Sequence, residues 1–90
     1  MADKAIDIKG ELRRFIIASY LLDNDGGRLS DDDSFLDQGI IDSIGVIELT
    51  GHIQRVYDIK IKVPEIVPAN FDTLNRLERY ITRKIQGKAR

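Results

Sequence analysis

The sequence contains no cysteine and only one histidine, His52. The lack of cysteine excludes disulfides, thiolate metal sites and a cysteine nucleophile, so any thiol chemistry must come from a group attached to the chain. A single histidine excludes a metal site built from several histidines. The chain must therefore act through its other side chains or through an attached group.

Long apolar runs and a large net charge are also missing. No run approaches the ~18 apolar residues that a membrane span needs, so we expect no membrane association. Residues 1–9 alternate polar and apolar side chains without an apolar signal core, which favours an intracellular, cytoplasmic protein. The net charge of −1 argues against a general nucleic-acid binder.

The length of 90 residues predicts one domain, spanning 1–90. We expect an ordered core of about residues 5–86, a frayed tail at 87–90, and a monomer, since the sequence gives no signal for a dimer. The small net charge conceals two segments of opposite sign. Residues 23–48 carry eight acidic residues against one basic residue, and residues 76–90 carry six basic residues against one acidic residue. The molecule should therefore be dipolar.

Hydrophobic periodicity predicts an all-α protein, a four-helix bundle of three long helices and one short helix. The first helix is expected over residues 6–22, with Asp3 or Asp7 as its cap, and it ends at the turn-forming run 23–27. The positions that recur at three- and four-residue steps along its inner stripe are Ile8, Leu12, Phe15, Ser19 and Leu22, and Ile16 widens the stripe.

A long loop, residues 28–41, joins the first two helices. It is polar at residues 30–34 and apolar later, and Gly39 is expected to take a positive φ. A loop of this length with apolar anchors is more often functional than idle. The residues that should fold back onto the core are Phe35, Leu36, Ile40 and Ile41.

The second helix is expected over residues 42–57, with Asp42 as its N-cap. Pro64 should start a single helical turn that ends at Pro68. The last helix should follow Asp72 as its N-cap and end at Gly87. Its apolar stripe consists of Leu74, Leu77, Ile81 and Ile85.

The second helix has two apolar faces. On a helical wheel that starts at Ser43 and advances about 100° per residue, the face toward the core consists of Val46, Leu49, Ile53, Val56 and Tyr57. The opposite face consists, with its flanking charges, of Ile44, Ile47, Gly51, Glu48 and Arg55. Either the long loop covers this second face, or the face is a docking patch for a partner and Gly51 permits a close approach.

Ser43 stands alone at the start of this helix, and three interpretations are open. Serine is common at helix starts, so the residue could be only a cap. A catalytic serine fails on geometry, because His52 lies half a turn around the helix and about 13 Å along its axis, and no G-x-S-x-G elbow is present. A modified serine is the third interpretation, because a phosphodiester there would lie in the favourable field of the helix N-terminus.

Residues 39–49 form the pattern Gly-x-x-Asp-Ser-Ile-x-x-Ile-Glu-Leu. Residues 57–59, 64–66 and 71–74 fit the end of that helix, a short third helix and the entry to a fourth. These segments resemble the acyl carrier and peptidyl carrier protein family, whose hallmark is Asp-Ser-Leu/Ile at the start of the second helix. The resemblance covers nearly the whole chain, from the first helix to Ile85.

The resemblance implies that Ser43 is esterified with 4′-phosphopantetheine, which a phosphopantetheinyl transferase takes from coenzyme A. The thiol of this arm would hold acyl or aminoacyl groups as thioesters, which fits a chain without cysteine. In the family, Asp42 also helps the transferase to recognise the site. Ile44, Ile47 and Gly51 would form the docking patch, with Glu48 steering basic partners.

The carrier itself would be no enzyme. It would receive its cargo from an acyl- or aminoacyl-AMP ligase or an acyltransferase. It would then deliver that cargo to downstream enzymes of fatty-acid, polyketide, nonribosomal-peptide or related biosynthesis, raising its effective concentration there.

The charge pattern departs from that of typical fatty-acid carriers, whose second helix is rich in glutamate. Here that helix carries Glu48 but also His52 and Arg55, and the last helix is basic. Isolated carriers that serve dedicated ligases, including aminoacyl, D-alanyl and secondary-metabolite types, resemble this pattern more closely. The chain begins at its own Met1, so we expect a free-standing carrier.

The alternative is a non-catalytic helical adaptor or a DNA-binding domain that uses the basic last helix. Its support is the stripe of Arg76, Arg79 and Arg83, which is equally expected of a solvated face that partly balances the acidic loop. The helix lacks the side-chain cluster needed for base reading, and the acidic loop opposes phosphate binding.

Three other features point to structural roles. The run of residues 31–33 is all aspartate, but no calcium-loop spacing follows it, so we expect a solvated acidic loop. His52 is expected on the solvent side or at the edge of its helix. Tyr57 and Tyr80 are expected in the core or at its edge.

Overall fold

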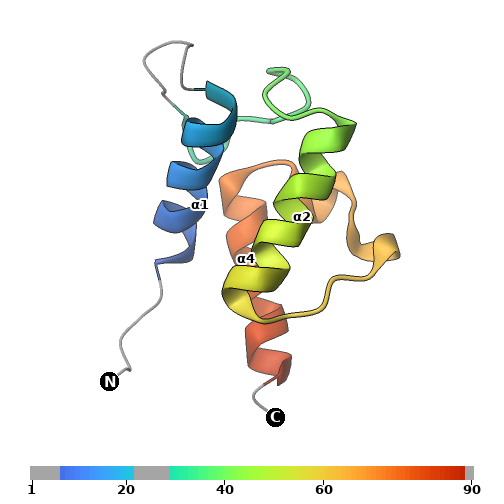
Figure 1. Ribbon diagram of the computed structural model, residues 1–90. Coiled ribbons are helices and arrows are strands. Elements are labelled where there is room, and N and C mark those ends of the chain that lie inside the picture. The colour runs from blue at the N-terminus through green and yellow to red at the C-terminus, as the bar shows by residue number, and fades with distance from the viewer. Residues whose placement is uncertain (1–6, 22–28, 89–90) are drawn as a thin grey trace.

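The computed structural model describes residues 7–21 and 29–88 (Figure 1). Within these ranges the protein is built from helices and connecting loops, without a β-strand. In chain order the elements are α1 (Ile8–Ile16), the π-helical segment η1 (Ile17–Leu21), α2 (Ser43–Tyr57), the 3₁₀ helix η3 (Val63–Glu65), α3 (Pro68–Phe71) and α4 (Leu74–Lys88). The predicted all-α bundle, with a long loop between its first two helices, is confirmed.

The three long helical segments lie side by side, and the loop before α2 crosses one end of the bundle (Figure 1). α1 runs opposite to α2 and α4, and α4 lies behind the other two in this view. Both the beginning of α1 and the end of α4 are therefore at the end of the bundle away from that loop. The beginning of α2 lies at the loop end, so Ser43 is presented at one tip of the molecule.

Asp7 caps α1, because its side chain accepts a hydrogen bond from the backbone N–H of Gly10 at 3.0 Å. This was one of the two predicted caps. The other, Asp3, and the predicted helix-ending turn at residues 23–27 lie outside the described residues.

The end of the first helix differs from the prediction of one regular helix through residue 22. Beyond Ile16 the chain forms a π-turn, which spaces inward-facing residues five positions apart rather than three or four. Leu21, five residues after Ile16, is therefore buried, whereas Ser19, which the regular stripe placed inside, is exposed.

The last third of the chain corrects three predicted boundaries. Pro68 begins α3 instead of ending the previous turn, which suits a residue that lacks a backbone N–H. The cap of α4 is not Asp72 but Thr73, whose Oγ1 accepts a hydrogen bond from the backbone N–H of Arg76 at 3.0 Å. The helix also continues through Gly87 to Lys88, one residue beyond its predicted end.

The core forms where α1 and α2 pack on α4. Its fully buried side chains are Leu12, Ile16, Leu49, Ile53, Leu74, Leu77 and Ile81. Tyr57 and Tyr80 are buried as predicted. Val56 is not, because 47 % of it is exposed beside a hollow between the start of α1 and the end of α2. The core face of α2 is therefore narrower at its C-terminal end than the helical wheel predicts.

Candidate functional site

Ser43 is the first residue of α2, and it is exposed. Asp42 is the N-cap, as predicted, and its Oδ1 accepts a hydrogen bond from the backbone N–H of Gly45 at 2.8 Å. The backbone N–H groups of Ser43 and Ile44 have no acceptor in the described part of the chain, as expected for a first helical turn. An exposed hydroxyl thus stands beside free amide donors at the positive end of the helix dipole, an arrangement that suits a phosphodiester.

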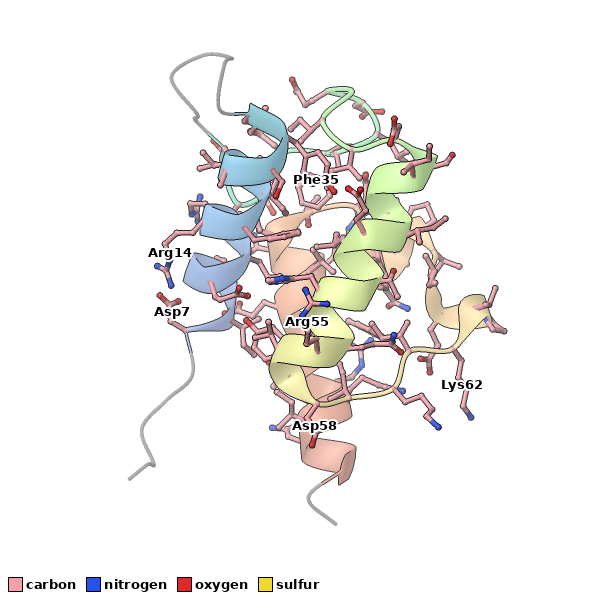
Figure 2. All side chains as sticks on the ribbon, in the orientation of Figure 1. Asp7, Arg14, Phe35, Arg55, Asp58 and Lys62 are labelled. Carbon is pink, nitrogen blue, oxygen red and sulfur yellow. The ribbon has the colours of Figure 1, made fainter. Side chains whose placement is uncertain are left out.

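The loop before Ser43 is anchored by apolar side chains. Phe35 and Ile41 are buried, and Figure 2 shows Phe35 near the crossing loop at the Ser43 end of the bundle. Gly39 has a φ of 65°, which confirms the predicted positive value. Ile40 is partly buried, but Leu36 is 60 % exposed, so the prediction that it anchors the loop was wrong.

The same loop is also held by Asp72, which lies just before α4. The carboxylate of Asp72 accepts hydrogen bonds from Ser34 Oγ and, at 3.0 Å, from the backbone N–H of Leu36. The backbone carbonyl of Asp72 accepts a third, from the N–H of Phe35, at 2.9 Å. Because Asp72 serves the loop, it is unavailable as the cap of α4.

The second face of α2 is open to solvent. Ile44 is 68 % exposed and Ile47 is 70 % exposed, so the loop does not cover them. Glu48 and Arg55 are exposed as well, and the sticks in Figure 2 show Arg55 on the surface of α2. A Cβ placed on Gly51 would meet nothing within 4 Å. Each of the five residues has another of them three or four positions away along the helix, so they lie on one face, which is exposed except at the half-buried Gly51.

Tyr20 joins the end of the first helix to this surface, which sequence analysis missed. Its hydroxyl lies 2.8 Å from Glu48 Oε1 and 3.3 Å from the backbone oxygen of Gly45. Burial and the neighbouring Glu48 carboxylate raise the pKa of Tyr20 to about 12, so the group remains a protonated donor near neutral pH. The hydrophobic period of a regular α-helix does not predict the position of Tyr20, because the π-turn changes the direction in which the side chains after Ile16 point.

An apolar cavity lies between the loop, α2 and the segment that contains α3. Its volume is about 200 Å³, and only one of its lining residues is charged. Those residues are Phe35, Leu36, Ile41, Val46, Leu49, Ile66, Val67, Pro68, Phe71 and Asp72.

His52 packs against α1. It was predicted on the solvent side or at the edge of its helix, and the solvent side is wrong. Its ring stacks on Phe15, with centroids 3.8 Å apart and planes 13° apart. Its Nε2 lies 2.7 Å from Glu11 Oε2, and the hydroxyl of Tyr57 donates to the other oxygen of Glu11 at 2.8 Å. Burial and this carboxylate raise the pKa of Tyr57 above its usual range. Glu11 thus joins α1 to α2, and His52 is engaged with α1.

The acidic loop is paired with α1. Asp31 accepts hydrogen bonds from Lys9 and from Arg13, and the Arg13 guanidinium is the main cause that lowers the pKa of Asp31. Asp32 accepts a hydrogen bond from Asn75 Nδ2 at 2.6 Å. Among the described residues, no group of three or more acidic, histidine or cysteine side chains is arranged to hold a metal ion.

The basic stripe of α4 turns toward α3 instead of the acidic loop. Arg76 donates to the backbone oxygen of Pro68 at 3.3 Å, and Arg83 donates to the side-chain oxygen of Asn70 at 3.4 Å. Arg79 is exposed. The cations that balance Asp31 are therefore those of α1, and the stripe is mainly a solvated face.

A family model described as the phosphopantetheine attachment site matches residues 16–81. The chain belongs to the phosphopantetheine-attachment family. This carrier is similar to a D-alanyl carrier protein of Streptococcus sanguinis (strain SK36), with 30 % identity over 77 residues, and to one of Streptococcus mutans serotype c, with 31 % identity over 77 residues. Each alignment covers 86 % of the carrier and 94 % of the relative. A D-alanyl carrier protein of Streptococcus gordonii is 29 % identical over the same length.

Family membership confirms the predicted class of protein and its cofactor. The carrier is a non-catalytic protein with a covalently attached 4′-phosphopantetheine. Its partners include a phosphopantetheinyl transferase and biosynthetic enzymes. Within residues 7–21 and 29–88, no helix is both long and apolar enough to cross a membrane.

Proposed function

We propose that Ser43 carries the 4′-phosphopantetheine arm and that the thiol of the arm takes a D-alanyl group as a thioester. The observation that carries the attachment site is the exposed serine at the first residue of α2, beside two amide donors that have no acceptor among the described residues. The D-alanyl cargo is supported by relatives that are aligned over 94 % of their length and are named D-alanyl carrier proteins.

The side chains around Ser43 fit such an attachment. In the transfer from coenzyme A, Ser43 Oγ forms the new bond to phosphorus, adenosine 3′,5′-bisphosphate leaves, and a base of the transferase takes the hydroxyl proton. The free N–H groups of Ser43 and Ile44 face the negative charge of the resulting phosphodiester. Asp42 keeps the first turn wound through its bond to Gly45, so these donors are already in place. When attached, the arm supplies the thiol that the chain lacks.

The exposed face of α2 is the proposed docking patch for the transferase and the loading ligase. We define the docking patch as Ile44, Ile47, Glu48, Gly51 and Arg55. Ile44 and Ile47 leave most of their surface in water, an arrangement that costs free energy in the isolated carrier and is relieved by an apolar partner surface. Glu48 and Arg55 have opposite charges, so they fix the orientation of a partner better than they raise its affinity.

The loading step is proposed to use an ATP-dependent ligase that forms an aminoacyl adenylate. The carrier then acts in the cytoplasm, where coenzyme A and ATP are available, and works as a monomer. Downstream, an enzyme that accepts the thioester transfers the D-alanyl group to an acceptor hydroxyl or amine.

A second candidate cargo is an apolar acyl chain. The observation that favours it is the apolar cavity of about 200 Å³ beside the start of α2. An acyl chain in this cavity would gain about 0.8 kcal/mol per buried methylene. A D-alanyl group has too little apolar surface to gain from it, so the two cargoes are distinguishable by experiment.

The attachment is tested by intact-protein mass after incubation with coenzyme A, magnesium and a broad-specificity phosphopantetheinyl transferase. The parent and a Ser19→Ala control, which removes another exposed serine, should gain one phosphopantetheinyl unit. Ser43→Ala should gain none. A modified Ser43→Ala protein, or an unmodified but folded parent, would contradict the proposed site.

The cargo is tested on the modified carrier with a purified ligase that forms D-alanyl adenylate, and separately with one that forms octanoyl adenylate. We expect the D-alanyl unit to appear in the intact mass and to disappear with hydroxylamine, which cleaves thioesters. Loading of octanoate without D-alanine would favour the second candidate and contradict the first.

A further inference from the structure

A second hollow lies beside Ser43, next to the end of the first helix. Its volume is about 290 Å³. It is lined by both chain neighbours of Ser43, which are Asp42 and Ile44, and by Tyr20, Ile40 and Glu48 among others. Ser43 itself is not a lining residue, but a group attached to its side chain begins between two residues that are. The hollow shares no lining residue with the apolar cavity near α3.

One wall of the hollow is already in place without a ligand. The π-turn brings Tyr20 against the first turn of α2, where a Cβ on Gly45 would lie only 3.4 Å from Tyr20 Cε1. The hydroxyl of Tyr20 lies 2.8 Å from Glu48 Oε1 and so holds this carboxylate at the edge of the hollow. Tyr20 and Glu48 thus form a fixed polar part of the lining, and Ile40 and Ile44 are apolar residues of the same lining.

The chemistry of the lining matches one part of the arm. The pantoyl segment, which follows the phosphate, has two methyl groups on one carbon, then a hydroxyl and an amide N–H. Ile40 and Ile44 provide apolar contact for the methyl groups. The carboxylates of Asp42 and Glu48 and the oxygen of Tyr20 provide acceptors for the hydroxyl and the N–H. A simple acyl chain has methylenes but no donors, so it offers these acceptors no further hydrogen bond.

We propose that this hollow seats the pantoyl segment of the arm, with Tyr20 as a positioning residue. This inference rests on the attachment of the arm to Ser43. Ile44 and Glu48 belong both to the hollow and to the docking patch. A partner that binds the patch therefore competes with the seated arm and releases its thiol end toward the partner's active site.

The direct test is an isotope-filtered NOE experiment on the modified carrier, with a ¹³C,¹⁵N-labelled chain and an unlabelled arm. We expect contacts from the two pantoyl methyl groups to the methyl groups of Ile40 and Ile44 and to the ring of Tyr20. Contacts to Val46 or Phe71 of the apolar cavity would overturn the proposal, and so would the absence of contacts from the arm to the chain.

Tyr20→Phe tests the role of the hydroxyl, since it keeps the ring and removes one hydrogen-bonding group. We expect the ratio of seated to unseated arm to fall roughly five-fold, the factor expected for one neutral hydrogen bond. Tyr80→Phe is the matched control, because Tyr80 also donates to a carboxylate, that of Glu65, at 2.8 Å, and it lies outside the hollow. An unchanged population in Tyr20→Phe, or equal losses in both variants, would overturn the role of Tyr20.

Intact-protein mass distinguishes a failure of arm attachment at Ser43 from a failure of the arm to occupy the hollow. A folded parent that gains no arm at Ser43 overturns the proposed function and this inference together. A parent that gains the arm at Ser43 but shows no contacts with Ile40 or Ile44 overturns this inference alone.

Discussion

Ile41 Cγ2 lies 2.8 Å from the position that a Cβ on Gly45 would occupy. The loop that leads to Ser43 therefore approaches α2 so closely that only glycine fits there without movement of its neighbours. Gly51 lies in the same helix, but a Cβ there would meet nothing within 4 Å. Close packing therefore requires glycine at position 45, whereas position 51 lies at an open surface where the fold would accept a side chain.

Alanine at these two positions should change stability in opposite directions. Gly45→Ala forces Ile41 to shift and should lower the free energy of unfolding by about 1–3 kcal/mol. Gly51→Ala removes backbone freedom from the unfolded chain and should raise the free energy of unfolding by about 0.5–1 kcal/mol. Urea unfolding followed by circular dichroism measures both. Gly51→Ala should nevertheless load more slowly with the ligase, and an unchanged rate would remove Gly51 from the docking patch.

Asp72→Ala should loosen the loop before Ser43. The variant loses the acceptor for Ser34 Oγ and for the N–H of Leu36, and we expect the free energy of unfolding to fall by about 2 kcal/mol. The transferase should also modify Ser43 more slowly, because the loop beside it is less fixed. Asp37→Ala is the control, since it removes an exposed carboxylate from the same loop and should cost less than about 0.5 kcal/mol. Equal effects of the two variants would contradict the anchoring role.

Ile47→Ala should separate docking from folding. Ile47 is 70 % exposed, so the free energy of unfolding should change by less than about 0.5 kcal/mol. If Ile47 enters an apolar pocket on the ligase, kcat/KM for loading should fall about ten-fold, which corresponds to about 1.4 kcal/mol. Val56→Ala makes a similar truncation at the other end of α2, outside the docking patch, and should load normally. A comparable loss of loading in Val56→Ala would argue against a specific patch.

Glu65 should make the free energy of unfolding depend on pH under acidic conditions. The Tyr80 hydroxyl, the backbone N–H of Lys62 and the Lys84 ammonium lower the pKa of Glu65 from 4.5 to about 2. A lowered pKa means that the unfolded chain takes up the proton first. The contribution of Glu65 is therefore complete above pH 4.5 and is lost as the pH falls toward 2.

Glu65→Gln should remove this part of the pH dependence. The difference in free energy of unfolding between parent and variant should be largest near neutral pH and should shrink through the acid window, as measured by urea unfolding at a series of pH values. Asp37→Asn, at an exposed site, should differ from the parent by a nearly constant amount. A constant difference for Glu65→Gln as well would show that its interactions do not depend on ionisation.

The parts of the site that depend on local sequence were predictable. Asp42 as the cap and Ser43 as the first helical residue follow from the residues around them, since capping involves only neighbours in the chain. The outward face of α2 was also predictable, because helical periodicity places Ile44 and Ile47 opposite Leu49 and Ile53.

The parts that depend on tertiary contacts were not predictable. Asp72 has the right residue type for a cap, but it binds a loop more than thirty residues away in the chain. Tyr20 reaches α2 only because the first helix changes to a π-turn, which no periodicity indicated. Glu11 is an acidic residue in the first turn of α1, yet it binds two side chains of α2, His52 and Tyr57. Each of these contacts joins segments whose distance is set by packing.

The exposure of Ile44 and Ile47 also bears on how such a carrier can evolve. Since both side chains remain mostly in water, selection for a stable fold places little constraint on them. If the proposed docking patch binds the partner enzymes, substitutions there would change the choice of enzyme while the buried residues stay the same. One helix thus has a buried inner face, which is constrained by the packing of the fold, and an exposed outer face, which is not.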